Sequence, residues 1–274
     1  MKNVFNIKRG VMITVITMVI VSIGYFMFQS ITSPAKAVAK QGNPVQLASE
    51  QPTVEIKKAA PSRFNGKERK VVYLTFDDGP GKYTAELLNT LKQNDVKATF
   101  FLIGNNVKQF PKLVKRERAE GHYVGMHSMT HDFKKLYTNG EYINEMKEDQ
   151  SLIANILGES PTLTRPPYGS MPGLNESLRN KVVDAGFKVW DWTIDSLDWK
   201  YNKMSIAAAS AQITQNVLAG ATGSREVILM HDIHPQSVAA VPAIIKRLKE
   251  KGYEFEAYNE ADHFSVNFWH DKRI

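Results

Sequence analysis

From residue 70 to residue 258 the sequence alternates between short strand-like segments and longer helix-like segments. The strand-like segments are rich in β-branched and aromatic residues, and the helix-like segments repeat apolar residues every three or four positions. We expect strands at 71–76, 98–103, 123–128, 163–165, 187–194, 226–230 and 253–258, with helices at 83–93, 107–120, 142–157, 175–185, 205–218 and 238–249. Strict alternation predicts an α/β fold with a parallel sheet, here a distorted (β/α) barrel of about seven strands.

Polar residues follow the carboxyl end of five of these predicted strands. Because barrel enzymes build their sites on the face where those ends meet, we expect the polar residues to lie together. The acidic pair in Asp77-Asp78-Gly79-Pro80, taken alone, is equally typical of a turn. The five groups are Asp77-Asp78, His127 with His131, Arg165 to Tyr168, Asp195 with Asp198-Trp199, and His231-Asp232.

His127 and His131 have the spacing of a metal-ligand pair. One helical turn would put both imidazoles on the same side, although two histidines that only cap or pack a helix are the alternative. With a carboxylate on the same face they would hold one divalent metal and leave a position open, as catalytic zinc sites do. The chain has no cysteine, so the ligands are nitrogen and oxygen atoms. Zinc is expected, with cobalt, nickel or iron as alternatives.

The amino-terminal part of the chain predicts a membrane anchor followed by a tether. Residues 10–28 carry no charge and would rise about 28 Å as a helix, close to the hydrocarbon thickness of about 30 Å. Basic residues without an acid precede this run, which predicts that residues 1–9 are cytoplasmic and that everything after the run lies outside. Residues 29–68, with four prolines, predict an extracytoplasmic linker. The alternative is a signal peptide cleaved near residues 33–37, which would give a secreted protein.

The net charge and the composition limit the classes of molecule that the protein is expected to bind. The net charge of +7 suits an anionic surface such as a membrane or an acidic polymer. No basic-aromatic motif of a nucleic-acid-binding module occurs, so no nucleic acid is expected as a partner. We expect a monomer, with residues 261–274 forming a carboxyl-terminal tail that packs as a cap.

Five ordered motifs resemble those of the polysaccharide deacetylases, the NodB-homology group also called carbohydrate esterase family 4. The resemblance covers about residues 69–258, and we expect the catalytic domain to span 69–260. The motifs are Thr75-Phe76-Asp77-Asp78-Gly79-Pro80, His127-Ser128-x-x-His131, Arg165-Pro166-Pro167-Tyr168-Gly169, Asp195-x-x-Asp198-Trp199 and Leu229-Met230-His231-Asp232.

The resemblance implies that the two aspartates have different roles. Asp78, His127 and His131 would hold the metal. Asp77 would be the general base that deprotonates the attacking water. Arg165 would orient Asp77 through a charge-assisted hydrogen bond.

The resemblance also implies the remaining catalytic groups. His231 would be the general acid, tuned by an acidic partner that is either Asp198, which we favour, or Asp195. The backbone N–H of Tyr168 would stabilise the oxyanion. The residues expected to contact the substrate are Pro167, Tyr168, Trp199 and Leu229.

The expected function is metal-dependent removal of acetyl groups from N-acetylglucosamine residues of peptidoglycan, with release of acetate. Chitin oligomers, poly-N-acetylglucosamine and O-acetylated xylan are alternative substrates. N-Acetylmuramic acid is a further alternative, but the branch of the family that acts on it commonly lacks the residue at Asp78. An inactive wall-glycan-binding module would have lost ligand or base residues, and all are present here. A two-metal phosphoesterase would need further clustered ligands, which the sequence lacks.

Overall fold

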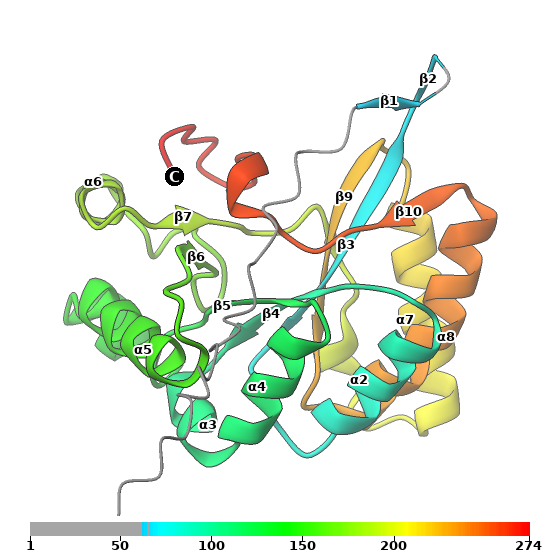
Figure 1. Ribbon diagram of the computed structural model, residues 1–274, viewed down its shortest axis with the longest axis horizontal. Coiled ribbons are helices and arrows are strands. Elements are labelled where there is room, and N and C mark those ends of the chain that lie inside the picture. The colour runs from blue at the N-terminus through cyan, green and yellow to red at the C-terminus, as the bar shows by residue number, and fades with distance from the viewer. Residues whose placement is uncertain (1–61, 65) are drawn as a thin grey trace, which may run out of the picture. The chain divides into compact units, whose positions relative to one another are not determined.

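The computed structural model describes residues 62–64 and 66–274 (Figure 1). The predicted membrane segment at 10–28 and nearly all of the predicted linker lie outside the described residues. Within the described part of the chain, no helix combines the length and the apolar character that crossing a bilayer requires. The last residues of the predicted linker form an antiparallel ribbon, in which β1 (Arg63–Phe64) pairs with β2 (Lys67–Glu68).

One parallel sheet is built around β3 (Lys70–Asp77), whose seven last residues are all buried. The strand order is β7-β6-β5-β4-β3-β9-β8. The strand β10 pairs with the first residues of β3, and β4 pairs with its last residues, so both lie on the same side of β3. This arrangement confirms the predicted parallel α/β fold. The other strands are β4 (Thr99–Leu102), β5 (Tyr123–Met126), β6 (Leu163–Thr164), β7 (Lys188–Val189), β8 (Ile194–Asp195), β9 (Arg225–His231) and β10 (Tyr253–Phe255).

The sheet is strongly curled, because β7 and β8 lie at opposite ends of the strand order yet are close in the chain. Seven strands in a flat sheet would put the two edges about 29 Å apart. The five residue steps from Val189 to Ile194 reach at most about 18 Å. β7 and β8 do not pair with each other among the described strands, so the chain itself bridges the gap. The predicted single strand at 187–194 is therefore wrong: this segment leaves one edge of the sheet and joins the other.

Alternate residues of β3 face different hydrophobic clusters. The outer cluster, between the sheet and the helices, contains Val72, Leu74 and Phe76. The inner cluster, inside the curl, contains Val71 and Tyr73 together with Trp190 and Val227. Because side chains alternate along a strand, Thr75 and Asp77 continue the inner face. Polar groups of the inner face at the carboxyl end of the sheet therefore lie next to the inner hydrophobic cluster.

Helices connect successive strands and cover the outer face of the sheet. In Figure 1, α7 and α8 lie together beside β9, and α3, α4 and α5 lie beside β4 and β5. The predicted helix at 107–120 divides at Pro111, since proline lacks the N–H that a helix interior needs and suits the first turn of a new helix. The helices are α2 (Thr84–Gln93), α3 (Gly104–Gln109), α4 (Pro111–Ala119), α5 (Tyr142–Leu157), α6 (Glu176–Asp184), α7 (Ile206–Gly220) and α8 (Pro235–Glu250).

Three short helical segments complete the described structure, and the carboxyl-terminal residues pack back onto the fold. Trp190 donates its indole N–H to the carbonyl of Phe264 at 2.8 Å, and Trp269 donates its own to the carbonyl of Ser170 at 2.9 Å. The final residue, Ile274, is fully buried. The short segments are the π-helix η1 (Lys134–Thr138) and the 3-10 helices η2 (Asp198–Tyr201) and η3 (Glu260–Asp262).

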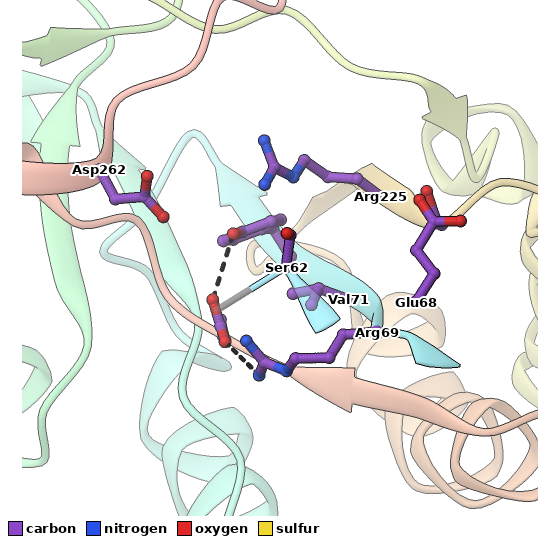
Figure 2. Close-up of a pocket in the computed structure, with 9 residues that line it drawn as sticks. Ser62, Glu68, Arg69, Val71, Arg225 and Asp262 are labelled. Carbon is purple, nitrogen blue, oxygen red and sulfur yellow. Dashed lines mark hydrogen bonds and ion pairs between the residues drawn. The ribbon is translucent and has the colours of Figure 1, made fainter. Parts of the chain in front are cut away.

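A pocket of about 270 Å³ opens at the amino-terminal end of β3, at the other end of the strand from Asp77 (Figure 2). Inside it, the Tyr73 hydroxyl and Arg69 both bind the carboxylate of Glu256. Catalytic sites of parallel α/β barrels lie at the carboxyl ends of the strands, so this pocket is not the candidate site. Its lining residues are Ser62, Glu68, Arg69, Val71, Tyr73, Ser224, Arg225, Glu256 and Asp262.

We predict that Leu74→Ala lowers the free energy of unfolding by about 2–5 kcal/mol, because it leaves a cavity in the outer cluster. Val183→Ala, at a position 36% exposed on α6, is the control and should change it by no more than about 0.5 kcal/mol. Urea denaturation at 25 °C measures both. Equal effects at the two positions would contradict the placement of Leu74 in the core.

Candidate metal centre and active site

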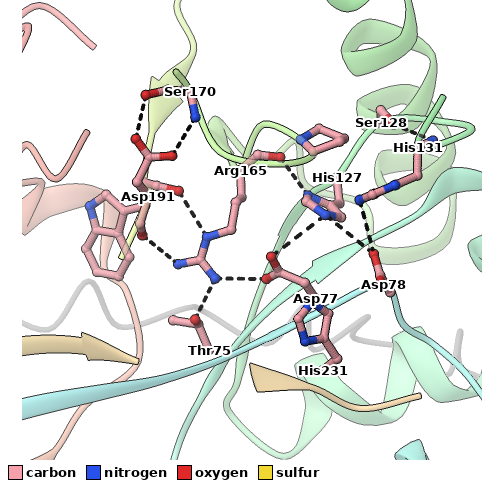
Figure 3. Close-up of polar contacts among 12 residues, drawn as sticks. Thr75, Asp77, Asp78, His127, Ser128, His131, Arg165, Ser170, Asp191 and His231 are labelled. Carbon is pink, nitrogen blue, oxygen red and sulfur yellow. Dashed lines mark hydrogen bonds and ion pairs between the residues drawn. The ribbon is translucent and has the colours of Figure 1, made fainter. Parts of the chain in front are cut away.

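Asp78, His127 and His131 bring three potential metal ligands together at the carboxyl end of the sheet (Figure 3). One ligand atom from each residue lies within 4.8 Å of the other two. The Nε2 atoms of His127 and His131 lie 3.5 and 3.7 Å from the same oxygen, Asp78 Oδ1. That oxygen is buried and accepts no hydrogen bond from any described residue. An acceptor without a partner, facing two imidazoles, is available to a cation.

The backbone at Asp78 explains how two consecutive aspartates reach the same site. In a continuing strand, Asp78 would face the side of the sheet opposite to Asp77. Instead Asp78 has a φ of 71°, in the left-handed region, which ends the alternation immediately after β3. Asparagine and aspartate tolerate this conformation better than most residues. The carboxylate of Asp78 therefore turns toward the histidines.

The His127 ring is oriented by the backbone carbonyl of Arg165. Its Nδ1 lies 2.7 Å from that oxygen, so Nδ1 carries the proton and donates, and the Nε2 lone pair faces Asp78. Burial lowers the pKa of His127 to about 3, which keeps the ring neutral at physiological pH, as a metal ligand must be. Two imidazoles and one carboxylate fit a divalent ion that takes nitrogen and oxygen ligands.

The residues between the two histidines do not form the helical turn that the spacing predicts. They form a loop in which Ser128 has a φ of 68° and His131 a φ of 56°. The Ser128 hydroxyl accepts the N–H of His131 at 3.0 Å, and the two ring centroids are 5.0 Å apart. The two imidazole rings lie close together, as predicted. They are brought together by a loop in which Ser128 and His131 have left-handed backbone conformations, and not by a helical turn.

Asp77 lies beside the ligand cluster and is held by Arg165. The guanidinium donates from Nη1 to Asp77 Oδ1 at 2.8 Å and to the hydroxyl of Thr75 at 2.5 Å. The other oxygen of Asp77 lies 3.7 Å from His127 Nε2. Asp77 is 2% exposed; burial raises the pKa of its carboxyl, and the charge of Arg165 opposes the rise. A buried carboxylate with a raised pKa and one oxygen directed at the ligands has the properties of a general base.

His231 stands next to Asp77, because the two residues are in register on β9 and β3. Its Nδ1 lies 2.8 Å from Asp198 Oδ1, and its backbone N–H donates to Oδ2 at 2.7 Å. Burial alone would lower the pKa of His231, but the hydrogen bond and charge of Asp198 raise it to about 9. The Ser237 hydroxyl donates to Asp198 as well. Of the two aspartates proposed from the sequence, Asp198 contacts His231, whereas Asp195 accepts a backbone N–H of its own loop.

The predicted substrate-contacting residues divide into an exposed and a buried pair. Tyr168 is 57% exposed and Trp199 is 49% exposed. Tyr168 has a φ of 67° and donates its hydroxyl to the carbonyl of His131, and its backbone N–H has no acceptor among the described residues. Pro167 and Leu229 are buried. Leu229 lies two positions before His231 on β9, and therefore on the same inner face.

Several residues that support the site were not recognised from the sequence. Asp191, fully buried, accepts the N–H and hydroxyl of Ser170 and thereby fixes the loop that follows Arg165. Glu145 and Asp149 accept backbone N–H groups of the histidine loop. One signal was present: these two acids lie one turn apart on the apolar face of α5, where an acidic residue is out of place.

The comparisons with known proteins agree with the geometry. A family model described as polysaccharide deacetylase matches residues 65–190. A peptidoglycan-N-acetylglucosamine deacetylase of Bacillus cereus is 78% identical over 274 residues, which is 100% of both chains. A putative polysaccharide deacetylase of Bacillus subtilis is 38% identical, over 92% of this chain and 90% of the relative.

A solved structure supports the same assignment. The crystal structure of a polysaccharide deacetylase from Bacillus cereus has a TM-score of 0.75 and 82% identity, and it covers 75% of this chain and 100% of its own. The resemblance predicted from the five motifs is thus confirmed by sequence and by fold. The chain belongs to the polysaccharide deacetylase family, a family of hydrolases.

Proposed function

We propose that this protein removes acetyl groups from N-acetylglucosamine residues of cell-wall peptidoglycan. The observation that carries the proposal is the cluster of Asp78, His127 and His131 beside the buried carboxylate of Asp77. The substrate is inferred from the Bacillus cereus relative, whose name specifies that glycan and whose chain aligns over its whole length.

The site is proposed to hold one divalent ion, with Asp78, His127 and His131 as its ligands. When bound, the ion would polarise the acetyl carbonyl and lower the pKa of the attacking water. We infer zinc, with cobalt or nickel as alternatives, because the available ligands are nitrogen and oxygen atoms.

In the proposed mechanism, Asp77 accepts the proton of the attacking water. The oxygen that faces His127 is available for this step, because Arg165 binds the other one. As water adds to the carbonyl carbon, negative charge develops on the carbonyl oxygen. The N–H of Tyr168, which lacks an acceptor among the described residues, would donate to that oxygen.

His231 would then protonate the leaving nitrogen. Its Nδ1 is bound to Asp198, so Nε2 is the atom that carries the transferable proton. When the C–N bond breaks, this proton passes to the amine of the glucosamine, and acetate is released. Asp198 keeps the imidazolium oriented and charged without taking up the proton itself.

An exposed aromatic surface beside the ligands suits a sugar chain. Tyr168 and Trp199 present about half of their surface, and the ring of Phe133 lies 5.6 Å from that of Tyr168. Aromatic rings supply large, rigid apolar faces with a polar tip. We propose that these rings contact the sugars, while Pro167 and Leu229 line the floor under the acetyl group.

We further propose that the domain acts outside the cell, where this substrate lies. The uncharged run at 10–28, preceded by basic residues, is the basis for a single-pass membrane anchor, and secretion after cleavage is the alternative.

Asp77→Asn should keep metal binding and lower kcat by about a thousandfold, because the amide cannot accept the proton of water. His127→Ala should lose both bound metal and activity. His270→Asn, an exposed substitution outside the cluster, is the control and should retain both. Metal analysis by plasma mass spectrometry and acetate release measure the two properties. Full activity in Asp77→Asn would contradict the assignment of the base.

The pH dependence of kcat tests the assignment of His231 as the general acid. His231 must be protonated to act, so activity should fall as the pH rises through its raised pKa of about 9. Asp198→Asn removes the hydrogen-bonded charge that raises the pKa, and the alkaline limb of kcat should move down by at least about one pH unit. Asp195→Asn should leave that limb in place. A shift in Asp195→Asn and none in Asp198→Asn would reverse the assignment.

The substrate is tested by acetate release from purified peptidoglycan, chitin oligomers and acetylated xylan at equal acetyl concentration. We expect the largest kcat/KM with peptidoglycan. Analysis of the released sugars should locate the free amines on glucosamine. Free amines on muramic acid, or a preference for xylan, would contradict the proposed substrate.

A further inference from the structure

Helix α5 presents two buried carboxylates to the loop that carries His127 and His131. Glu145 is 3% exposed and Asp149 is fully buried, and the two lie one helical turn apart. Acidic side chains are almost never buried to this degree unless they are paired. Neither residue belongs to the five motifs, and neither is placed in the proposed mechanism.

These carboxylates accept the backbone N–H groups of three residues in the loop. Asp149 Oδ2 accepts from His127 at 3.2 Å. Glu145 Oε2 accepts from both Met129 and Thr130 at 3.0 Å, and the Thr130 hydroxyl binds the same carboxylate. Two side chains of one helix thus fix the backbone on both sides of Ser128.

The loop needs such support because its conformation is unfavourable for its sequence. Ser128 and His131 both have positive φ values, which non-glycine residues adopt at a cost in energy. Strained residues of this kind persist only when the surrounding structure determines their conformation. Helix α3 contributes too, since the N–H of Gly104 donates to the carbonyl of Ser128 at 2.9 Å.

A role in stability alone does not account for both acids. Asp149 Oδ1 is buried and has no hydrogen-bond partner among the described residues, which costs free energy. Glu145, in contrast, also pairs with Lys135 at 2.7 Å. The Glu145 carboxylate presents only acceptors to the N–H groups of Met129 and Thr130, whereas the amide of Gln would offer a donor as well.

We propose that Glu145 and Asp149 are positioning residues for the metal ligands. They hold the loop in the left-handed conformation that presents both histidine Nε2 atoms to Asp78. They are not ligands themselves; they act on the loop through its backbone N–H groups and, in the case of Glu145, through the Thr130 hydroxyl as well. This inference rests on the proposed metal site at Asp78, His127 and His131.

The test is the zinc affinity of Glu145→Gln in the full-length protein, measured by competition with a chromophoric chelator. We expect the Kd for Zn²⁺ to rise by about 10- to 100-fold, the usual effect of removing a group that orients a ligand. Glu148→Gln is the matched control, because it makes the same change on the same helix at an exposed residue that pairs with Lys108 and not with the histidine loop in the described structure. Its Kd should stay within twofold of the parent value.

Asp149→Asn provides a second variant, should Glu145→Gln fail to fold. Circular dichroism of each metal-free variant establishes that the fold is intact before zinc is added. A folded Glu145→Gln or Asp149→Asn with the parent Kd would overturn the positioning role and leave the metal site standing. No zinc binding by the parent protein would instead overturn the metal site itself.

Discussion

The buried guanidinium of Arg165 is the interaction on which the rest of the site depends. It donates to Asp77 and Thr75 on β3 and to the carbonyls of Trp190 and Asp191, which lie where the chain crosses between the two edges of the sheet. Its own carbonyl accepts the Nδ1 proton of His127. One residue therefore fixes Asp77, the proposed base, His127, a proposed metal ligand, and the closure of the curled sheet.

The environment of Arg165 explains why this arrangement persists. The side chain is fully buried, and its guanidinium lies 4.1 Å from the ring centroid of Phe101. A buried cation without partners would be costly, but here three nitrogens donate to four oxygens, which satisfies four of the five N–H groups of the guanidinium. Such a planar, forked set of donors is specific to arginine, since lysine offers a single point charge. Losing any one of these partners would leave part of a buried charge without a hydrogen bond, which is costly.

The two adjacent aspartates have different surroundings. Asp77 is the last residue of β3, faces inward and is neutralised by Arg165. Asp78 follows in the left-handed region and leaves a buried oxygen without a hydrogen-bond partner in the described structure. These surroundings are the basis for proposing that Asp77 exchanges a proton and that Asp78 binds a cation.

Much of this architecture could be predicted from the sequence because it follows from periodicity. The alternation of apolar patterns predicted the parallel sheet, and polar residues at strand ends predicted a common face. The local conformation of the histidine loop was predicted wrongly, since spacing alone does not distinguish a helical turn from a loop with Ser128 and His131 in the left-handed region.

Two other features depend on tertiary contacts that a pattern does not encode. Residues 187–194 have the composition of one strand, and only the curl of the sheet divides them between β7 and β8. The acids of α5 are recognisable as unusual on an apolar face, but their partners are backbone N–H groups of a distant segment. The sequence therefore predicted which side chains lie together at the site, but it did not predict the backbone conformation that brings them together.

The most direct test of the central claim is anomalous diffraction at the zinc absorption edge from crystals of the protein grown with Zn²⁺. The account predicts one strong peak about 2.0–2.2 Å from the Nε2 atoms of His127 and His131 and from a carboxylate oxygen of Asp78. Asp77 should remain bound to Arg165 and outside the coordination sphere. A peak at other residues, or Asp77 as a ligand in place of Asp78, would contradict the proposal that Asp78 binds the metal and that Asp77 acts as the base.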